Sequence, residues 1–483
     1  MGRAQIASRP VWSSLWSLGL TVACLLVAGC YRAPTPPRLF VLITVDTLRA
    51  DHLGAYGSQR DLTPRLDALA LESVIFTSAY SATSFTLPSV STILTGRYPE
   101  ELGIWNNESA VAASVPTLAS ALRQQGWRTG AVVSNFVLRA SSGLAAGFDV
   151  YDDEFPQKER VRKWPERVAT DTTDAFFQTL DACTAGEAPC FVWVHYQDPH
   201  GPYTPPPGHR ERHLEAERDA PDGRRRLPVL PSGRGGLGAI PHYQHLNGQH
   251  EVAFYRAGYD AEVAYMDAEV GRLLNGIAVR GLVGDTLLVF TADHGEGLGE
   301  YDYWFAHGEH LIDPLVHVPL MIRAPGVPPE RRDDLVAAVD LFPTVLNALG
   351  AADGDLPPLG RDLLAARAEA SPSTPYLATL GAGSVRRYGI VAGDYKFIVS
   401  LNGGVWDGLL LRRGVESVNL TGPAPQIASS LRLRLNEFRD RLPVRPEIRQ
   451  KFSPEDLEQL RALGYVDVPQ PDAGAPSPDP PDG

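Results

Sequence analysis

The sequence is short of positive charge. Its 44 lysines and arginines stand against 57 aspartates and glutamates, which gives a formal net charge of −13. Nucleic-acid backbones attract basic proteins, so this acidic balance argues against a nucleic-acid partner. It does not argue against a small anionic substrate, because the binding of such a molecule depends on the local charge near a metal.

Cysteine is scarce as well, with four in 483 residues. Cys24 and Cys30 lie in the N-terminal segment, and Cys183 and Cys190 bracket the sequence Thr-Ala-Gly-Glu-Ala-Pro. Neither pair has the spacing of a zinc site, which argues against cysteine-bound zinc. For the second pair, a small disulfide formed in an oxidising compartment and two free thiols both remain open.

Long apolar runs are missing except at the N-terminus, where residues 11–28 follow Arg3 and Arg9. This order of basic, apolar and small residues predicts a secretory signal. Val27-Ala28-Gly29-Cys30 resembles a bacterial lipobox, in which Cys30 would be lipidated and become the mature N-terminus. An uncleaved membrane anchor is the alternative. In both cases we expect an exported, membrane-anchored protein that faces the periplasm or the cell exterior.

Composition along the chain divides it into five parts. A Pro-rich stretch follows Cys30, and the last residues are rich in Pro, Asp and Gly, which predicts disorder. Residues 208–250 form an insertion with seven arginines and five histidines, which we expect to be either a solvated loop or a lid. The expected parts are a signal peptide (1–30), a tether (31–38), a catalytic domain (39–350), a C-terminal subdomain (351–465) and a disordered tail (466–483).

Apolar strand-like runs alternate with helical patterns between residues 39 and 350. This alternation predicts an α/β fold of three layers, with helices covering both faces of a mostly parallel sheet, followed by a smaller α+β subdomain. Ligand sites in such folds lie beyond the carboxyl ends of the strands. The expected strands are 39–45, 130–134, 191–195, 286–291 and 318–322, and the expected helices are 64–70, 87–94, 118–125, 168–180, 255–277 and 341–349.

Three of these strands end in acids or histidines. Asp46 follows the first strand, His195 and His200 lie at the end of another, and Asp293-His294 follows a third. The carboxyl ends of parallel strands share one edge of a sheet, so we expect these side chains to converge. Asp46, Asp293 and His294 would then supply oxygen and nitrogen ligands to a divalent cation.

Several motifs, in the same order along the chain, resemble those of the sulfatase family within the alkaline phosphatase superfamily. Their agreement at compatible spacings implies an alkaline-phosphatase-like α/β sandwich and a metal-dependent hydrolase of anionic esters. The motifs are Val45-Asp46-Thr47-Leu48-Arg49-Ala50-Asp51-His52-Leu53-Gly54, Leu87-Pro88-Ser89, Leu94-Thr95-Gly96-Arg97-Tyr98-Pro99, Asp198-Pro199-His200-Gly201-Pro202-Tyr203, Tyr259-Asp260-Ala261-Glu262-Val263-Ala264-Tyr265-Met266-Asp267 and Thr291-Ala292-Asp293-His294-Gly295.

The resemblance implies one or two divalent ions (calcium, manganese or zinc) held by Asp46, Asp293 and His294. Thr47 stands where the family often has a second acid, and we include it among the metal candidates. His195 is interpreted as a structural residue at a strand end.

The resemblance also implies residues around the transferred group. His200 and His307 would lie beside it, to protonate a leaving oxygen or to bind a second metal; a surface histidine is the alternative for His307. Asn107 stands where the family often has a substrate-contacting amide, with Asn106 as a close rival, and Arg97 is a further substrate-binding candidate.

The nucleophile position departs from the family pattern. Sulfatases carry Cys or Ser followed by X-Pro-X-Arg and convert the first residue to formylglycine, whereas this chain reads Thr86-Leu87-Pro88-Ser89-Val90. Threonine cannot form that aldehyde. Thr86 resembles instead the Thr-nucleophile phosphodiesterases and phosphotransferases of the superfamily, and a helix N-cap is its alternative role. Ser84 and Ser89 are rival hydroxyls.

These observations predict displacement at phosphorus, or alternatively sulfur, through Thr86, with a small or lipid- or glycan-linked anionic ester as the substrate. Two alternatives are a sulfatase that works without formylglycine and an inactive lipid-anchored binding protein.

Overall fold

The computed structural model describes residues 1–2, 36–158, 165–231, 235–246, 248–352, 359–365, 373–380, 385–402, 405–416 and 418–462. The predicted signal peptide with Cys30, most of the tether and the predicted tail lie outside the described residues. The chain divides into Met1–Pro36 and Pro37–Gly483, and the second unit carries the fold. Across the described ranges, no helix has both the length and the apolar character needed to cross a membrane.

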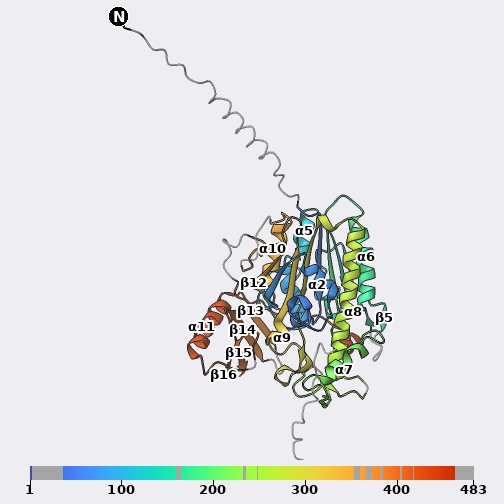
Figure 1. Cartoon of the computed structure of the whole chain (residues 1–483), viewed down its shortest axis with the longest axis vertical. Helices are drawn as coiled ribbons and strands as arrows, with labels where there is room; N and C mark the ends of the chain where they lie inside the picture. Colours follow the sequence, from blue (N-terminus) through green and yellow to red (C-terminus); the bar gives the residue numbers. More distant parts are fainter. Residues whose placement is uncertain are drawn as a thin grey trace, which may run out of the picture. The chain divides into compact units, whose positions relative to one another are not determined.

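A sheet of eight strands forms the centre of the second unit (Figure 1), in the order β12-β2-β11-β8-β1-β7-β3-β4. Strand β1 (Leu39–Val45) pairs in parallel with β7 (Cys190–Tyr196) on one side and with β8 (Thr286–Ala292) on the other. All residues of these three strands are buried, as expected for parallel strands that are covered on both faces. Beyond β7 lie β3 (Arg128–Val133) and β4 (Val150–Asp152), both parallel.

The other half of the sheet is mixed. β11 (His317–Arg323) runs antiparallel to both β8 and β2 (Val74–Tyr80), and β12 (Glu330–Ala337) pairs with β2 in parallel. The predicted α/β class with a mostly parallel sheet is confirmed. Strands β2 and β12 were not expected from the sequence. In β12, charged residues occupy much of the strand because it lies at the edge of the sheet and is half exposed.

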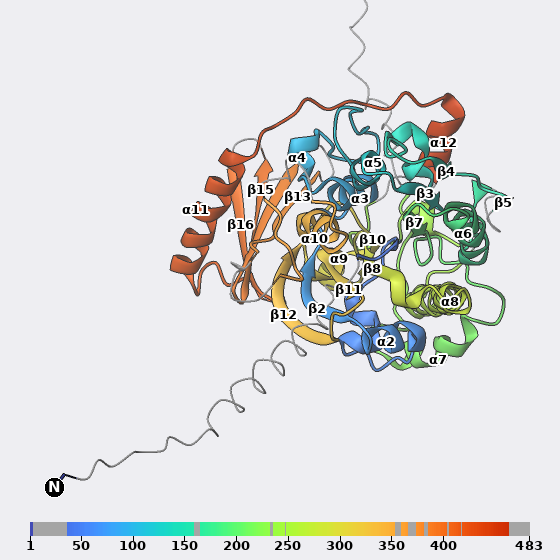
Figure 2. The same cartoon turned by 90° about the horizontal axis from the view of Figure 1, so that it is seen from above.

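Helices cover both faces of the sheet (Figure 2). On one face, α6 (Ala169–Thr184) packs on β3 and β7 and lies beside the long helix α8 (Val252–Val279), which in turn contacts α2 (Pro64–Ala70). On the other face lie α3 (Thr86–Thr95), α5 (Leu118–Gln124) and α10 (Leu341–Ala348).

A second, antiparallel sheet follows in the order β13-β14-β15-β16, with α11 packed against it. This sheet and helix form the predicted smaller α+β part. The terminal helix α12 returns to the first part, where Asp456 pairs with Arg139 at 2.8 Å. The bounds are β13 (Tyr376–Leu380), β14 (Arg386–Ala392), β15 (Tyr395–Asn402), β16 (Val405–Arg412), α11 (Pro425–Arg441) and α12 (Pro454–Ala462).

Cys183 and Cys190 form a disulfide between the end of α6 and the start of β7. Shorter elements connect the parts of the fold. The insertion contains a helix, α7 (Glu211–Asp219), packed on α8, so it is more than a loop. The remaining short elements are α4 (Pro99–Leu102), α9 (Asp313–Val316), β5 (Gln157–Lys158), β6 (Pro165–Glu166), β9 (Gly297–Leu298) and β10 (Trp304–Ala306).

Candidate active site

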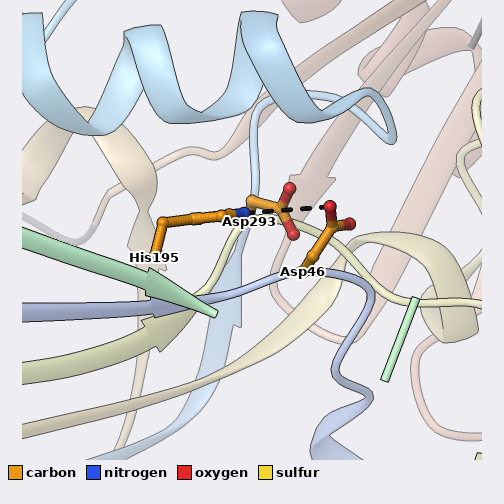
Figure 3. A group of neighbouring side chains, drawn as sticks. All are labelled: Asp46, His195 and Asp293. Atoms are coloured by element: carbon orange, nitrogen blue, oxygen red, sulfur yellow. Dashed lines mark ion pairs between the residues drawn. The ribbon is translucent and has the colours of Figure 1, made fainter. Parts of the chain in front are cut away.

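Two acids meet at the carboxyl edge of the central sheet. Asp46 follows β1 and Asp293 follows β8, and their backbone N–H groups continue the ladder to Tyr196 O at 2.9 Å and to Val45 O at 3.1 Å. Each of Asp46, His195 and Asp293 offers one ligand atom, and these atoms lie within 4.8 Å of one another (Figure 3). His294 joins them, because its Nε2 lies 3.8 Å from Asp46 Oδ1 and 3.5 Å from Asp293 Oδ2.

The donor set fits a divalent cation. Asp46 Oδ1 and Asp293 Oδ2 are buried and accept no hydrogen bond from any described residue. Burial raises the pKa of Asp293 well above its ordinary value, and the neighbouring Asp46 raises it further. Burial opposes ionisation of Asp46 too, but His200 and His195 hold its pKa below the ordinary value. Two buried aspartates beside imidazole nitrogens are a set of ligands that Mn²⁺ or Zn²⁺ would accept.

Thr47 lies against this cluster in a strained backbone conformation. Its φ is +55°, which β-branched residues rarely adopt. Its N–H donates to Asp293 Oδ1 at 3.2 Å, and the Tyr259 hydroxyl donates to its carbonyl at 2.7 Å. The Thr47 hydroxyl is buried and has no hydrogen-bond partner among the described residues. The strained turn therefore places the Thr47 amide beside Asp293.

Thr86 is the first residue of α3 and is fully buried. Its Oγ1 lies 3.3 Å from Nε2 of His294. Phe85 occupies the N-cap position, and no side chain at that position caps the helix. The Thr86 hydroxyl thus faces the acid and histidine cluster and does not cap α3.

The two rival hydroxyls are occupied by backbone carbonyls. Ser84 Oγ donates to His310 O at 2.8 Å, and Ser89 Oγ donates to Asp293 O at 2.5 Å. These bonds to the backbone indicate a structural role for both serines. Of the three hydroxyls, Thr86 is the one bonded to a histidine of the cluster.

Three histidine rings lie next to one another at the site. The His307 ring lies 4.7 Å from that of His294 and 5.0 Å from that of His200, measured between centroids. Burial lowers the pKa of His294 to about 3, with His307 as the second cause, and burial also lowers the pKa of His200. Neutral His294 is the form that binds a metal. His307 is 6% exposed, unlike a surface histidine.

Asn107 contacts the start of α3, because its Oδ1 accepts the Leu87 N–H at 3.0 Å. Asn106 instead bonds locally to the Glu108 N–H at 2.9 Å. Arg97 lies beyond the other end of α3, where it pairs with Glu101 at 3.7 Å. A helix of ten residues spans about 15 Å, so the structure does not bring Arg97 together with Thr86.

Two residues that the sequence did not single out as ligands face Asp46. His195 Nε2 lies 3.8 Å from Asp46 Oδ2, while its Nδ1 lies 2.9 Å from Thr44 Oγ1. Asn135, which follows β3 at the same edge, donates its side-chain N–H to Asp46 Oδ2. Both residues lie at the end of a strand at this edge of the sheet, and this position in the sequence could have identified them. The alternation of side chains along β7, which decides where His195 points, depends on the register of that strand.

The insertion reaches the wall of the site. The ring of Tyr243 stacks near that of His200, at 6.2 Å between centroids, and its hydroxyl donates to Phe305 O at 3.1 Å. Gln244 is buried against Gly201, where an added Cβ would lie 2.1 Å from the Gln244 side chain. This part of the insertion is therefore a packed component of the site and not a solvated loop.

Acids at the ends of parallel strands, together with a hydroxyl at a helix N-terminus, define a hydrolytic α/β enzyme. The sequence profile named Sulfatase matches residues 38–351, and the chain belongs to this family. It is thus a hydrolase of the alkaline phosphatase superfamily, whose members cleave sulfate and phosphate esters.

Named relatives agree with this assignment. The chain is 28% identical to human iduronate 2-sulfatase over 414 residues, which cover 70% of this chain and 74% of that protein. It is 26% identical to arylsulfatase A of Bos taurus, with 70% and 68% covered. The phosphonate monoester hydrolase of Agrobacterium radiobacter shares the fold, with a TM-score of 0.66, 20% identity, and 84% of this chain and 95% of that one covered.

Proposed function

We propose that this protein is a metal-dependent hydrolase, or a transferase, that acts on phosphate esters with Thr86 as its nucleophile, most readily on diesters. One observation carries the proposal: Thr86 Oγ1 lies 3.3 Å from His294 Nε2, at the end of α3 that faces Asp46 and Asp293. A side chain that served only to start the helix would have no need of this contact.

The chemistry of threonine supports phosphate over sulfate. The aldehyde of formylglycine forms from Cys or Ser, and the secondary alcohol of Thr86 cannot yield it. Without a hydrated aldehyde, the hydroxyl itself must attack, as in covalent catalysis by an activated alcohol.

Each residue of the site has its own role in the proposed reaction. Asp46, Asp293 and His294, with Thr47 beside them, would hold the cation, which when bound lowers the pKa of a coordinated hydroxyl and neutralises anionic charge. Thr86 Oγ loses its proton to water and forms a bond to phosphorus as the bond to the leaving oxygen breaks, and His307 or His200 gives that leaving oxygen a proton. Water then cleaves the Thr86 ester in a hydrolase, whereas an alcohol acceptor cleaves it in a transferase.

The proposed place of action is outside the cytoplasm. The order of basic, apolar and small residues before Cys30 supports export and a lipid on that cysteine. Such an anchor would hold the enzyme at a membrane, where lipid- or glycan-linked anionic esters are within reach.

The test compares hydrolysis of aryl phosphodiesters, phosphomonoesters and sulfate esters by wild type, Thr86→Ala and Thr92→Ala. Thr92 is a matched control, because it is a buried threonine of the same helix, bonded to Pro88 O at 3.0 Å. We expect metal-dependent diester turnover that falls by about 10³-fold or more in Thr86→Ala and stays near wild type in Thr92→Ala.

Two other outcomes would each favour one of the alternative functions. Sulfate turnover that survives Thr86→Ala would reject Thr86 and indicate a sulfatase that uses another nucleophile. Protein that binds no metal and hydrolyses none of the esters would indicate the inactive binding protein.

A further inference from the structure

A cavity of about 370 Å³ lies in the C-terminal part, between α11, the residues before β13 and the segment that follows α10. Small-molecule sites have volumes of about 300–1,000 Å³, so this cavity is large enough for a ligand. Its charged lining residues are three arginines (Arg361, Arg434 and Arg441) and one acid, Glu437. The excess of positive charge contrasts with the net charge of −13 of the whole chain. Residues 373–462 share this excess, with 13 lysines and arginines against nine aspartates and glutamates.

One wall of the cavity is a face of α11. Arg434, Phe438 and Arg441 follow one another at intervals of four and three residues, which places them on one side of the helix. Both arginines are exposed, and neither forms an ion pair within the described part of the chain. Arg434 donates to the neutral Thr374 Oγ1 at 3.2 Å. A basic residue in the last turn stabilises a helix, which accounts for Arg441 but not for Arg434, two turns earlier.

Arg361 belongs to the opposite wall. Its Nε donates to Ser373 Oγ at 2.7 Å and its Nη2 to Leu335 O at 2.9 Å, so neutral acceptors hold the guanidinium in place. Asp340, which does not line the cavity, accepts the Arg361 backbone N–H at 3.0 Å and the Ser373 hydroxyl at 2.6 Å. Arg361 is therefore a fixed cation that no side chain of the cavity neutralises.

The cavity also has apolar walls, to which Ile390 and the ring of Phe438 contribute. Ile390 packs in one cluster with residues of α11, whereas the next residue, Val391, packs in another with Tyr303. Successive side chains of a strand point to opposite faces of the sheet. The cavity thus lies on the α11 side of the sheet β13–β16, and the active-site loop that carries Tyr303 and His307 lies on the other.

We propose that this cavity binds an organic anion, with a phosphate or sulfate group between the three arginines and an apolar body against Phe438 and Ile390. Guanidinium groups donate paired N–H bonds to such oxyanions. A water molecule occupies about 30 Å³ of the liquid, so an inorganic ion alone would leave most of the cavity unfilled. The site needs neither the metal nor Thr86. Free phosphate esters and lipid headgroups both present this chemistry.

Calorimetric titration with phenylphosphonate tests the proposal, because this dianion carries an apolar ring and has no ester bond to hydrolyse. Chelator is present, so that no cation at the active site attracts the anion. We expect one molecule to bind per chain, about tenfold more tightly than inorganic phosphate, because the ring is buried as well. Wild type that binds no phenylphosphonate would overturn the proposal.

Variants of exposed residues locate the site without threatening the fold, which thermal unfolding checks. Arg434→Gln combined with Arg441→Gln should weaken binding about 30-fold or more. Arg432→Gln is the matched control, because Arg432 is an exposed arginine of α11 outside the cavity, and it should bind like wild type. Unchanged affinity in the double variant would overturn the proposal.

Glu437→Gln should change binding in the opposite direction. It removes the one negative charge among the lining residues, so phenylphosphonate should bind about threefold more tightly. Arginines that served only the stability of α11 would not give this gain, and weaker binding in Glu437→Gln would contradict the proposed anion.

Competition with dihexanoylphosphatidate, kept below the concentration at which it forms micelles, distinguishes the two sources of the ligand. Displacement at lower concentrations than those of phenylphosphonate would identify a lipid headgroup as the natural ligand. Displacement only at higher concentrations would identify a free phosphate- or sulfate-bearing molecule. Ester hydrolysis by Thr86 is a separate measurement, so loss of either proposal leaves the other in place.

Discussion

Thr86 Oγ1 and His294 Nε2 lie 3.3 Å apart although 208 positions separate the two residues in the chain. The contact joins the first residue of α3 to the loop that follows β8. It places a hydroxyl beside a histidine whose Nε2 lies 3.5 Å from Asp293 and 3.8 Å from Asp46, and the first predictions follow from this geometry.

Metal binding should stabilise the protein, and Asp293→Asn should remove that effect. Burial and Asp46 raise the pKa of Asp293, so its charged form is costly without a cation, and the neutral amide should unfold at a higher temperature than metal-free wild type at pH 8. Saturating manganese, at about 100 times its Kd, should stabilise wild type by about 2.7 kcal/mol.

Thermal unfolding with and without chelator measures both effects. Asp174→Asn serves as the control, because Asp174 is an exposed acid on α6 and should keep the metal response. A full metal shift in Asp293→Asn would show that the cation binds elsewhere.

Asn107→Ala should destabilise the protein more than Asn106→Ala and should reduce activity. Asn107 satisfies the Leu87 N–H at the start of α3, directly after Thr86, whereas Asn106 makes only local bonds. A lost cap of this kind costs about 1 kcal/mol. Urea unfolding and ester hydrolysis of the two variants check this, and identical behaviour would contradict it.

Glu100 should make stability fall as the pH rises. Burial raises its pKa from 4.5 to about 7, although the Tyr376 hydroxyl donates to it. Because the folded state holds this proton more tightly than the unfolded chain, the contribution is complete below about pH 4.5 and is lost as the pH rises through about 7. At 1.36 kcal/mol per pKa unit this contribution amounts to about 3 kcal/mol.

Glu100→Gln keeps the side chain neutral at every pH, so this loss between pH 5 and 8 should disappear from its unfolding curves. The exposed Glu437→Gln on α11 should behave like wild type. An unchanged pH profile in Glu100→Gln would show that another group is responsible.

Removal of the disulfide should weaken the second unit without changing the site. Cys183 and Cys190 close a short loop between α6 and β7, and a loop of this length contributes about 2–3 kcal/mol. Cys183→Ser with Cys190→Ser, compared with wild type in denaturant with and without reductant, measures this. Wild type that does not respond to reductant would contradict the prediction.

The motifs and the alternation of strands and helices were enough to predict the fold class and that Asp46, Asp293 and His294 lie together at one edge of the sheet. This worked because a buried parallel strand needs a continuous apolar run, and its end is visible where the first acid appears. Edge strand β12 could not be predicted from the sequence, because a half-exposed strand contains charged residues as often as a loop does.

What the sequence alone determined is local: which segments can be buried, where each strand stops, and that position 86 holds a hydroxyl that cannot become an aldehyde. The tertiary structure decided which of these side chains lie next to one another. His195 faces Asp46 because of the register between β7 and β1, and Thr86 meets His294 although 208 positions separate them. Such distances depend on contacts between residues far apart in the chain, which no local pattern of side chains records.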